Sequence, residues 1–357
     1  MARRPAGEGR GHVVAEAVLA GLGTAFPPAV SQADLWDGFF VRHYGGVQRA
    51  LGARIFRNAG VRRRHAAVSP LIEDVSGWST ARRMRRYLTE ALPLGKAAVG
   101  EALAAAQLQP SDVGMFAVCS CTGYVTPGLD ILLARDLGMA PETQRLFIGH
   151  MGCYAALPGL GMAADFTRSR GRPAVLLCLE LTSLHLQPST VDAEQIVAHS
   201  LFSDAAAAAV VRPAGPGYRL VEVASVTDAA SAGYMTWEVT DQGFRMGLSS
   251  RVPDVLDKHI ADLVQGLLAR NGLAVSDVDG WAVHPGGPRI IDVVQARLGL
   301  PDEAVSQSRA VLAGHGNCSS PTVLTILDAL APDGPRHVVA LAFGPGLTIY
   351  ATLLALG

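Results

Sequence analysis

The sequence contains few charged residues for its length. Asp, Glu, Lys and Arg make up 17% of the 357 residues, with 30 basic and 31 acidic side chains and a formal net charge of −1. A typical soluble domain has about 25% charged residues, so an unusual share of this chain should be interior. The balanced charge argues against nucleic-acid binding, and the one basic cluster, Arg62-Arg63-Arg64, is too short for a nucleic-acid-binding arm.

Cysteine is also scarce, with five residues and no paired spacing. An odd number without such spacing argues against a disulfide framework. Cys119 and Cys121 lie two residues apart on an expected strand but have no second pair of ligands in the sequence. We interpret both as core residues and expect no metal site.

No uninterrupted hydrophobic run predicts a membrane span. The longest uncharged stretch, residues 338–357, is broken by Gly344-Pro345-Gly346 and predicts two buried strands around a turn. The Arg- and Gly-rich N-terminus lacks the apolar segment of a signal peptide. Hydrophobic residues make up 49% of the chain, and the mean hydropathy is +0.26, which excludes disorder. We expect a cytoplasmic globular protein of about two domains.

The chain contains an internal repeat at long period. Three pairs of segments match at a spacing of 164 or 165 residues: 111–119 and 276–284, 149–153 and 314–318, and 172–175 and 336–339. A common spacing across three matches indicates duplication of one structural unit. We predict two related halves, residues 13–212 and residues 218–357, separated by a Pro-Ala-Gly-Pro-Gly stretch.

The hydrophobic pattern within each half is typical of an α/β fold. Short apolar runs after polar turns predict buried strands at residues 115–119, 175–181, 281–284 and 338–343. Helical patterns lie between them, at residues 96–106, 155–168, 255–270 and 321–331. Residues 205–211 and 218–226 predict an antiparallel pair. Duplicated mixed sheets predict five α-β-α-β-α layers, with two nearly uncharged helices, residues 154–166 and 321–330, between the sheets.

Three residues from distant segments are candidates for catalysis. Cys153 lies at the start of a predicted central helix, where free N–H groups favour the thiolate, although alone it also fits a buried core residue. His284 ends a predicted strand and precedes a Pro-Gly-Gly-Pro loop. Asn317 lies beside the repeat position that matches Cys153. If the repeat symmetry brings them together, they supply a nucleophile, a base and an oxyanion donor. Packing or hydrogen-bonding roles fit the remaining histidines considered, His150, His185, His199 and His315.

At these residues the sequence resembles the type III polyketide synthases, the chalcone-synthase-like branch of the thiolase superfamily. The most specific matches are residues 149–155, 284–288, 316–320 and 343–348, which occur in the family's order. The resemblance covers nearly the whole chain and implies a thiolase-like fold. It also implies that Cys153 is the acylated nucleophile and that His284 and Asn317 complete a catalytic triad.

The resemblance implies further roles around the triad. Phe202 matches the first gatekeeper between the CoA tunnel and the cavity, and Met246 matches the second, with Phe244 as the alternative register. Other cavity positions are matched by Thr122, Thr182, Ser319 and His185, the last of which replaces the Thr of plant chalcone synthases. Thr126 matches a residue offered to the partner subunit of a homodimer, and Arg54 matches a basic residue that binds CoA.

The reaction implied by the resemblance is that of an acyltransferase. An acyl-CoA starter is loaded on Cys153, extended with malonyl-CoA by iterative decarboxylative condensation, and cyclised, with no cofactor beyond the CoA substrates. The alternatives are a ketosynthase-like single condensation with malonyl-acyl carrier protein and a non-catalytic acyl-binding protein. The flexible Met246 and the small Thr122 favour a long starter and an alkylpyrone or alkylresorcinol, whereas the bulk of His185 favours a shorter or divided cavity.

Overall fold

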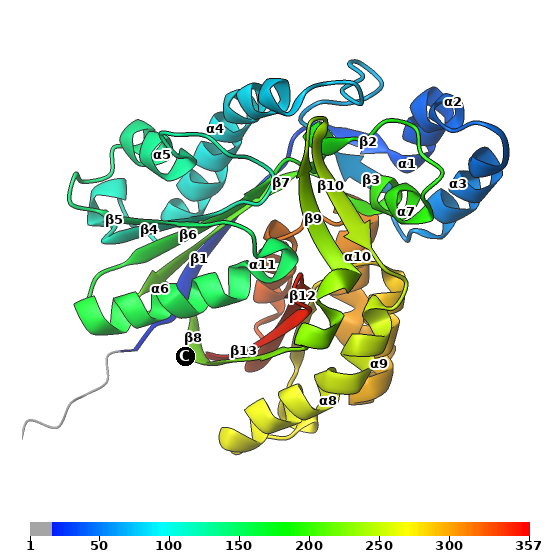
Figure 1. The fold of residues 1–357 in the computed structure, drawn as a ribbon. Coiled ribbons are helices and arrows are strands. Elements are labelled where there is room, and N and C mark those ends of the chain that lie inside the picture. The colour runs from blue at the N-terminus through cyan, green and yellow to red at the C-terminus, as the bar shows by residue number, and fades with distance from the viewer. Residues whose placement is uncertain (1–15) are drawn as a thin grey trace, which may run out of the picture.

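The computed structural model describes residues 16–357, and Figure 1 shows its fold. Residues 13–15 of the predicted first half lie outside the described residues. The strands are β1 Val18–Ala25, β2 Ala29–Ser31, β3 Arg63–His65, β4 Met115–Cys119, β5 Gln144–Ile148, β6 Ala174–Glu180, β7 Ala205–Arg212, β8 Tyr218–Thr227, β9 Met235–Thr240, β10 Gly243–Leu248, β11 Gly280–Val283, β12 His337–Gly344 and β13 Thr348–Leu356. The α-helices are α1 Gln32–Leu35, α2 Val41–His43, α3 Gly46–Asn58, α4 Thr80–Ala105, α5 Leu129–Leu137, α6 Ala156–Arg170, α7 Ala193–Leu201, α8 Val252–Arg270, α9 Pro288–Leu298, α10 Ser306–His315 and α11 Pro321–Leu330.

Nine strands form one mixed sheet in the order β11-β12-β13-β8-β1-β7-β6-β4-β5. The strand directions on the two sides of the β8–β1 junction correspond. Strand β4 runs parallel to β6 as β11 runs parallel to β12, and β6 is antiparallel to β7 as β12 is to β13. The sheet therefore consists of two related halves, and β5 extends only the first of them.

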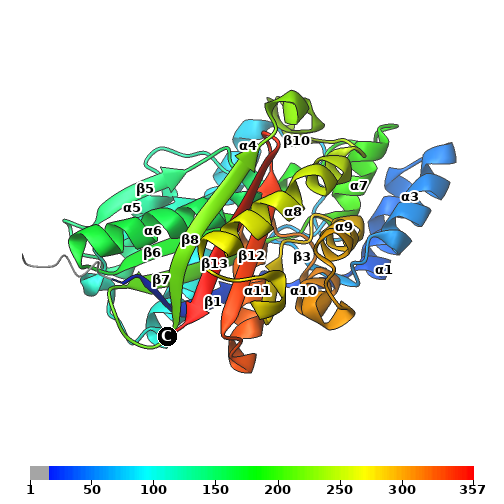
Figure 2. The ribbon, with the colours of Figure 1, turned by 90° about the horizontal axis from the view of Figure 1, so that it is seen from below.

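Helices divide the molecule into five layers, which can be followed in Figures 1 and 2. Helices α4 and α5 pack on the outer face of the first half of the sheet, and α8, with α9 beside it, packs on the outer face of the second. Helices α6 and α11 contact strands of both halves. This arrangement confirms the predicted α-β-α-β-α layers and the two central helices.

The composition of the helices explains which layer each occupies. Central helix α11 has eight buried residues among its ten, as a helix covered on both sides must. At the outer layer, two glycines of β1 allow α4 to approach the sheet closely. A Cβ atom on Gly21 would lie 2.3 Å from the carbonyl oxygen of Ala102, and one on Gly23 would lie 2.5 Å from that of Ala98.

The predicted antiparallel pairing of residues 205–211 with residues 218–226 is wrong. Both segments are strands, but β1 lies between them and is antiparallel to each, so that β7 and β8 run in the same direction. The stretch at residues 213–217 carries the chain across the end of β1 instead of closing a hairpin. A Pro- and Gly-rich turn is compatible with either path, and the long-range pairing of Leu19 with Tyr218 selects this one.

A separate two-stranded hairpin, β9 and β10, was not predicted. It lies outside the large sheet, close to α7 and the start of α4, as Figure 1 shows. The predicted strand–turn–strand at residues 338–357 is confirmed, since β12 and β13 pair antiparallel around a turn. Among residues 16–357, no helix combines the length and the apolar character that crossing a membrane requires.

Candidate active site

Cys153 lies in a turn of 3₁₀ helix, Gly152–Tyr154, that leads into the central helix α6. Two glycines fix this turn. Gly152 has a φ of 67°, in the left-handed region that favours glycine. A Cβ atom on Gly344, at the end of β12, would lie 2.9 Å from a ring carbon of Tyr154. The Cys153 side chain is consequently held with only 5% exposure.

His284 directly follows β11 and is fully buried. Its backbone N–H donates to the carbonyl oxygen of Leu341 in β12 at 2.8 Å, which continues the parallel pairing by one residue. The imidazole ring meets the ring of Phe343 edge-on, with 5.5 Å between centroids. Neither ring nitrogen has a hydrogen-bond partner within residues 16–357. No hydrogen bond within the described residues therefore fixes the orientation of this ring.

Asn317 lies in the bend between α10 and α11 and is buried. Its backbone N–H donates to the carbonyl oxygen of Leu201 and its own carbonyl accepts from the N–H of Ser203, both at 2.9 Å. Because these two bonds flank Phe202, Asn317 and Phe202 form a short parallel bridge. The side-chain oxygen of Asn317 accepts a hydrogen bond from the backbone N–H of Ser319 at 2.8 Å.

Burial disfavours the charged forms of both Cys153 and His284. It raises the pKa of Cys153 to about 12, against a hydrogen bond from Ser319 that acts in the opposite direction. Burial also lowers the pKa of His284 to about 3. The free N–H groups at the helix N-terminus, on which the sequence-based expectation of a thiolate relied, act against this cost. A cation next to Cys153 would favour the thiolate further.

Cys153 faces a small chamber of about 30 Å³, which is large enough to hold a water molecule. Five residues predicted from the family resemblance line it with Cys153, namely Thr122, Thr182, Phe202, Met246 and Ser319. The lining also contains residues that the sequence did not single out for this place, including Cys121, His150, Met235 and Trp237. His284 and Asn317 lie outside this lining.

The hairpin β9–β10 holds Met246 and Phe244, the two residues considered for the second gatekeeper position, in different surroundings. Met246 lies directly opposite Trp237 in the antiparallel pair, and both line the Cys153 chamber. Phe244 is absent from that lining and contributes to a second chamber. The geometry thus favours Met246 over Phe244 as the residue beside Cys153.

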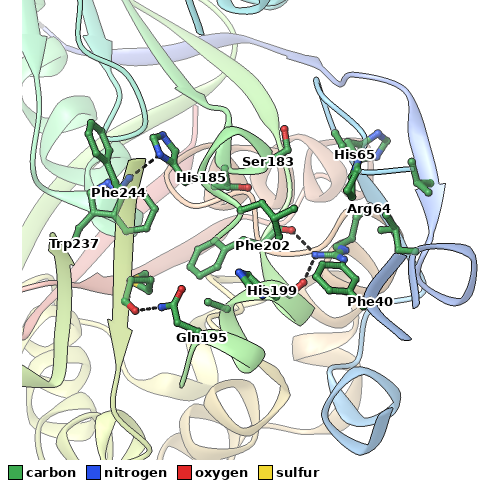
Figure 3. Close-up of a pocket in the computed structure, with 18 residues that line it drawn as sticks. Phe40, Arg64, His65, Ser183, His185, Gln195, His199, Phe202, Trp237 and Phe244 are labelled. Carbon is green, nitrogen blue, oxygen red and sulfur yellow. Dashed lines mark hydrogen bonds between the residues drawn. The ribbon is translucent and has the colours of Figure 1, made fainter. Parts of the chain in front are cut away.

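The second chamber has a volume of about 80 Å³ and is shown in Figure 3. It extends from the hairpin, where Trp237 and Phe244 lie, past Phe202 to Phe40 and Arg64. It shares four lining residues with the Cys153 chamber, namely Thr182, Phe202, Trp237 and Met246. The two chambers therefore adjoin at these four side chains, and His185 lines only the second chamber.

His185 is held in one orientation. Its Nε2 lies 2.7 Å from the carbonyl oxygen of Thr122, and its Nδ1 accepts from the backbone N–H of Phe244 at 2.9 Å. Burial lowers the pKa of His185 to about 3, so the ring is neutral with its proton on Nε2. The ring stacks on Phe244, with 4.5 Å between centroids. His185 thereby ties the hairpin to the loop that carries Thr122.

A third and larger cavity has a volume of about 610 Å³. Arg54 lines it together with Arg289, Gly286 and Phe343. Met235 lines both this cavity and the Cys153 chamber, so the two adjoin there. Of the remaining predicted residues, Thr126 lies exposed on the loop after β4, outside the linings of all three cavities.

Among the residues of the site that the sequence analysis missed, Cys121, Trp237 and Glu180 show why. Cys121 was interpreted as core, but it lines the Cys153 chamber, while Cys119 is in the core. Trp237 had no signal, because the hairpin that carries it was not predicted. Glu180, at the end of β6, is buried and accepts hydrogen bonds from the N–H of Cys121 and the hydroxyl groups of Thr122 and Ser320. A lone Glu that ends an apolar strand could have been recognised in the sequence.

Burial raises the pKa of Glu180 to about 7, although these hydrogen bonds favour its carboxylate. Glu180 connects the loop after β4 to the start of α11, both of which contribute to the Cys153 chamber. Within residues 16–357, no cluster of His, Cys, Asp or Glu has an arrangement that could hold a metal ion.

Comparisons with known proteins place this chain in a family. Residues 7–216 match the N-terminal domain of the chalcone and stilbene synthases, and residues 224–356 match their C-terminal domain. The chain is 36% identical over 354 residues to the 1,3,6,8-tetrahydroxynaphthalene synthase of Streptomyces peucetius subsp. caesius, covering 94% of this chain and 92% of that protein. It is 31% identical over 357 residues to the alpha-pyrone synthesis polyketide synthase-like Pks18 of Mycobacterium tuberculosis, covering 94% and 90%.

Solved structures agree. The 1,3,6,8-tetrahydroxynaphthalene synthase of Streptomyces coelicolor A3(2), a bacterial type III polyketide synthase, superposes with a TM-score of 0.89 at 29% identity, covering 95% of this chain and 99% of that chain. PKS-I from the brown alga Ectocarpus siliculosus superposes with a TM-score of 0.91 at 28% identity, covering 96% and 99%. The fold is thus the thiolase-like fold of acyltransferases of this kind. The chain belongs to the chalcone and stilbene synthase family and is a type III polyketide synthase.

Proposed function

We propose that Cys153 carries the acyl group during catalysis and that His284 and Asn317 hold the reacting thioester oxygen. Loading forms a bond between the Cys153 sulfur and the acyl carbon and breaks the bond from that carbon to the CoA sulfur. The thiol proton passes to His284, whose ring nitrogens are both without a partner in the described part of the chain. The charges on sulfur and imidazole then arise together, so that each offsets the cost that burial imposes on the other.

Extension follows from the same groups. His284 and the side-chain N–H groups of Asn317 donate hydrogen bonds to the thioester oxygen of malonyl-CoA, and loss of CO₂ leaves an enolate on that oxygen. By analogy with an oxyanion hole, each donor contributes roughly 2.7–4 kcal/mol. The carbanion attacks the acyl carbon on Cys153, and the thiolate leaves. Decarboxylation supplies the nucleophile, so neither group has to act as a strong base.

The CoA portion of both substrates is assigned to the cavity of about 610 Å³, with Arg54 as a phosphate contact. Two observations support this assignment. The cavity adjoins the Cys153 chamber at Met235, and Arg289 adds a second guanidinium to its lining. The reaction uses acyl-CoA and malonyl-CoA and no further cofactor.

The product is proposed to be an alkylpyrone with a short alkyl group. The Cys153 chamber is small, and the second chamber beyond it is divided from it by side chains that include Trp237. A short starter and few extensions fit this space better than a long acyl chain. Closure of a triketide to a lactone releases such a product from Cys153 without further groups.

The protein is proposed to act as a homodimer. Strand β5 is an edge strand of the large sheet, and apolar side chains are exposed near that edge: Phe147 on β5 is 39% exposed and Tyr124, in the loop that also carries Thr126, is 73% exposed. Pairing of this edge with a second copy would bury these side chains.

The test of the proposed activity is incubation with a series of acyl-CoA starters and isotopically labelled malonyl-CoA, with products identified by mass spectrometry. Short starters should give labelled pyrones and one acyl adduct per chain. The Cys153→Ala variant should give neither product nor adduct and should unfold like the wild type. An acyl adduct that persists on Cys153→Ala would contradict the assignment of the nucleophile.

A further inference from the structure

Arg64, on β3, is a buried arginine with 7% exposure, and the proposed reaction gives it no part. It contacts two segments that pair with each other: the end of α7, with Phe202 after it, and the bend that carries Asn317. We propose that Arg64 is a positioning residue that holds Asn317 where its amide can bind the thioester oxygen of malonyl-CoA. This inference rests on the proposed function, because it concerns the role assigned to Asn317.

The guanidinium of Arg64 caps the C-terminus of α7. Its Nη1 donates to the carbonyl oxygens of His199 and Phe202 at 2.6 Å and 3.0 Å, and Figure 3 shows both bonds. Carbonyl groups at the end of a helix lack intrahelical N–H partners and carry a partial negative charge, so a cation is favourable there. Burial lowers the pKa of Arg64 to about 10, which leaves the group charged at neutral pH. Arg64 therefore fixes the backbone at Phe202.

The same side chain reaches Asn317 by two routes. Phe202 and Asn317 are joined by the backbone hydrogen bonds of their parallel bridge, so the guanidinium acts on Asn317 through Phe202. The aliphatic stem of Arg64 packs against Gly316, the residue before Asn317. A Cβ atom on Gly316 would lie 3.2 Å from Cγ of Arg64 and 3.0 Å from the carbonyl oxygen of Leu201. The backbone before Asn317 is thus held between this stem and the end of α7.

Neither CoA binding nor an ion pair accounts for Arg64. It is absent from the lining of the cavity assigned to CoA. Asp204 attracts its charge, but that carboxylate already accepts hydrogen bonds from the backbone N–H groups of Ala67 and Ser183 and from the hydroxyl groups of Thr182 and Ser183. The Nε of Arg64 has no hydrogen-bond partner within residues 16–357. Burial of a cation with an unfilled donor costs free energy, so Arg64 contributes geometry more than stability.

Loss of Arg64 should impair decarboxylation and spare loading. Loading is assigned to Cys153 and His284, which other elements hold in place, namely the turn before α6 and the end of β11. A misplacement of about 1 Å can lower a rate by roughly 100-fold, and loss of one oxyanion donor lowers it by roughly 10²–10³. Decarboxylation should therefore fall by roughly 10- to 100-fold without Arg64.

The experiment measures decarboxylation as CO₂ release from malonyl-CoA and loading as the acyl adduct in the intact-protein mass. Arg64→Met keeps the aliphatic stem and removes the guanidinium. It should lower kcat for decarboxylation by roughly 10- to 100-fold, with KM for malonyl-CoA and the rate of loading close to those of the wild type. Arg63→Met is the matched control, because Arg63 is the neighbouring, exposed residue of β3. It should leave both steps unchanged.

A second variant guards against misfolding. Arg64→Lys keeps the stem and the charge but is shorter and lacks the planar guanidinium, so it should lower kcat by a smaller factor than Arg64→Met. It takes the place of Arg64→Met if urea unfolding shows that the methionine variant does not fold.

A double variant distinguishes a positioning role from an independent one. If Arg64 acts through Asn317, the folded Arg64 variant should lower decarboxylation no further when it is combined with Asn317→Ala. If Arg64 acts elsewhere, the two losses should multiply.

Three outcomes would overturn the inference: unchanged decarboxylation in the Arg64 variants, an equal loss of loading, or losses that multiply in the double variant. Failure of the proposed function looks different. In that case Asn317→Ala alone would release CO₂ from malonyl-CoA at the wild-type rate.

Discussion

The side-chain oxygen of Asn317 accepts a hydrogen bond from the backbone N–H of Ser319, two residues further along the chain. An amide whose oxygen is bound in this way cannot flip without placing its N–H groups against another N–H group. Its nitrogen therefore points away from Ser319, and its two N–H donors remain available to a substrate oxygen. The turn before α11 thus orients the donor that the proposed decarboxylation needs.

This orientation makes Asn317 sensitive to changes that keep its size. Asn317→Asp keeps an acceptor for Ser319 but replaces the donor with a second acceptor and adds charge. Both Asn317→Asp and Asn317→Ala should lower malonyl-CoA decarboxylation by roughly 10²–10³, as expected for loss of one oxyanion donor. Both should still load the starter on Cys153. CO₂ release and intact-protein mass measure the two steps separately, and loss of loading together with decarboxylation would contradict this division.

The reactivity of Cys153 should depend on His284. Burial alone raises the pKa of Cys153 to about 12, so a cation next to it would favour the thiolate near neutral pH. In His284→Ala the iodoacetamide alkylation profile should shift to higher pH, whereas in Asn317→Ala it should stay close to that of the wild type. His150 also lines the Cys153 chamber, and His150→Ala is the control. If His284→Ala and Asn317→Ala gave the same alkylation profile, or if only His150→Ala shifted it, His284 would not be the cation that pairs with the Cys153 thiolate.

Glu180 should make the stability of the protein depend on pH. Its pKa in the folded state is about 7, raised from 4.5 by burial, so the folded protein binds this proton more tightly than the unfolded chain does. The stabilisation from this proton is complete below pH 4.5 and is lost as the pH rises to 7 and beyond. The free energy of unfolding falls by about 3 kcal/mol over this pH range.

Urea unfolding at pH 5 and pH 8 measures this effect. The Glu180→Gln variant has no titratable proton at this position. The fall in its free energy of unfolding from pH 5 to pH 8 should therefore be much smaller than that of the wild type. The exposed Glu142 serves as the control through Glu142→Gln. Parallel pH dependence in the wild type and Glu180→Gln would show that Glu180 titrates in the folded protein as it does in the unfolded chain.

The edge of the sheet at β5 should form the subunit interface. Sedimentation should give a dimer at micromolar concentration, and Phe147→Arg should produce monomers because it places a charge among buried apolar groups. Val47 is 80% exposed on α3, at the opposite end of the molecule from β5 in Figures 1 and 2. Val47→Arg should leave the dimer intact. A wild-type monomer, or equal dissociation of both variants, would contradict this interface.

Local apolar patterns in the sequence were sufficient to predict many of the elements. Strand β4 has the predicted bounds, and the bounds of β6 and β12 differ from the prediction by only one residue at either end, because continuous apolar runs mark strands buried on both faces. The pairing of β7 and β8 could not be predicted in this way. It depends on contacts between residues nearly two hundred positions apart, and the turn residues between the strands do not encode them.

The internal repeat and the family resemblance predicted which residues of the sequence contribute to the site. Phe202 and Ser319 lie beside Cys153, in the same chamber lining. The hairpin that carries Trp237 has no counterpart among the predicted elements, since its alternation is interrupted by exposed residues such as Val239, which is 70% exposed. The effect of burial on the pKa of Cys153 was also beyond the sequence, because it depends on how completely the surrounding layers close.

The insertion of β1 between β7 and β8 has a consequence for the synthesis of the chain. β1 is synthesised before β7 and β8, yet one of its edges pairs with β7 and the other with the start of β8. A chain that ends at residue 212 would leave the second edge open and available to other chains. The two halves, although related by duplication, should not be obtainable as separate soluble pieces, and β1 should gain its full protection from hydrogen exchange only after the second half has been made.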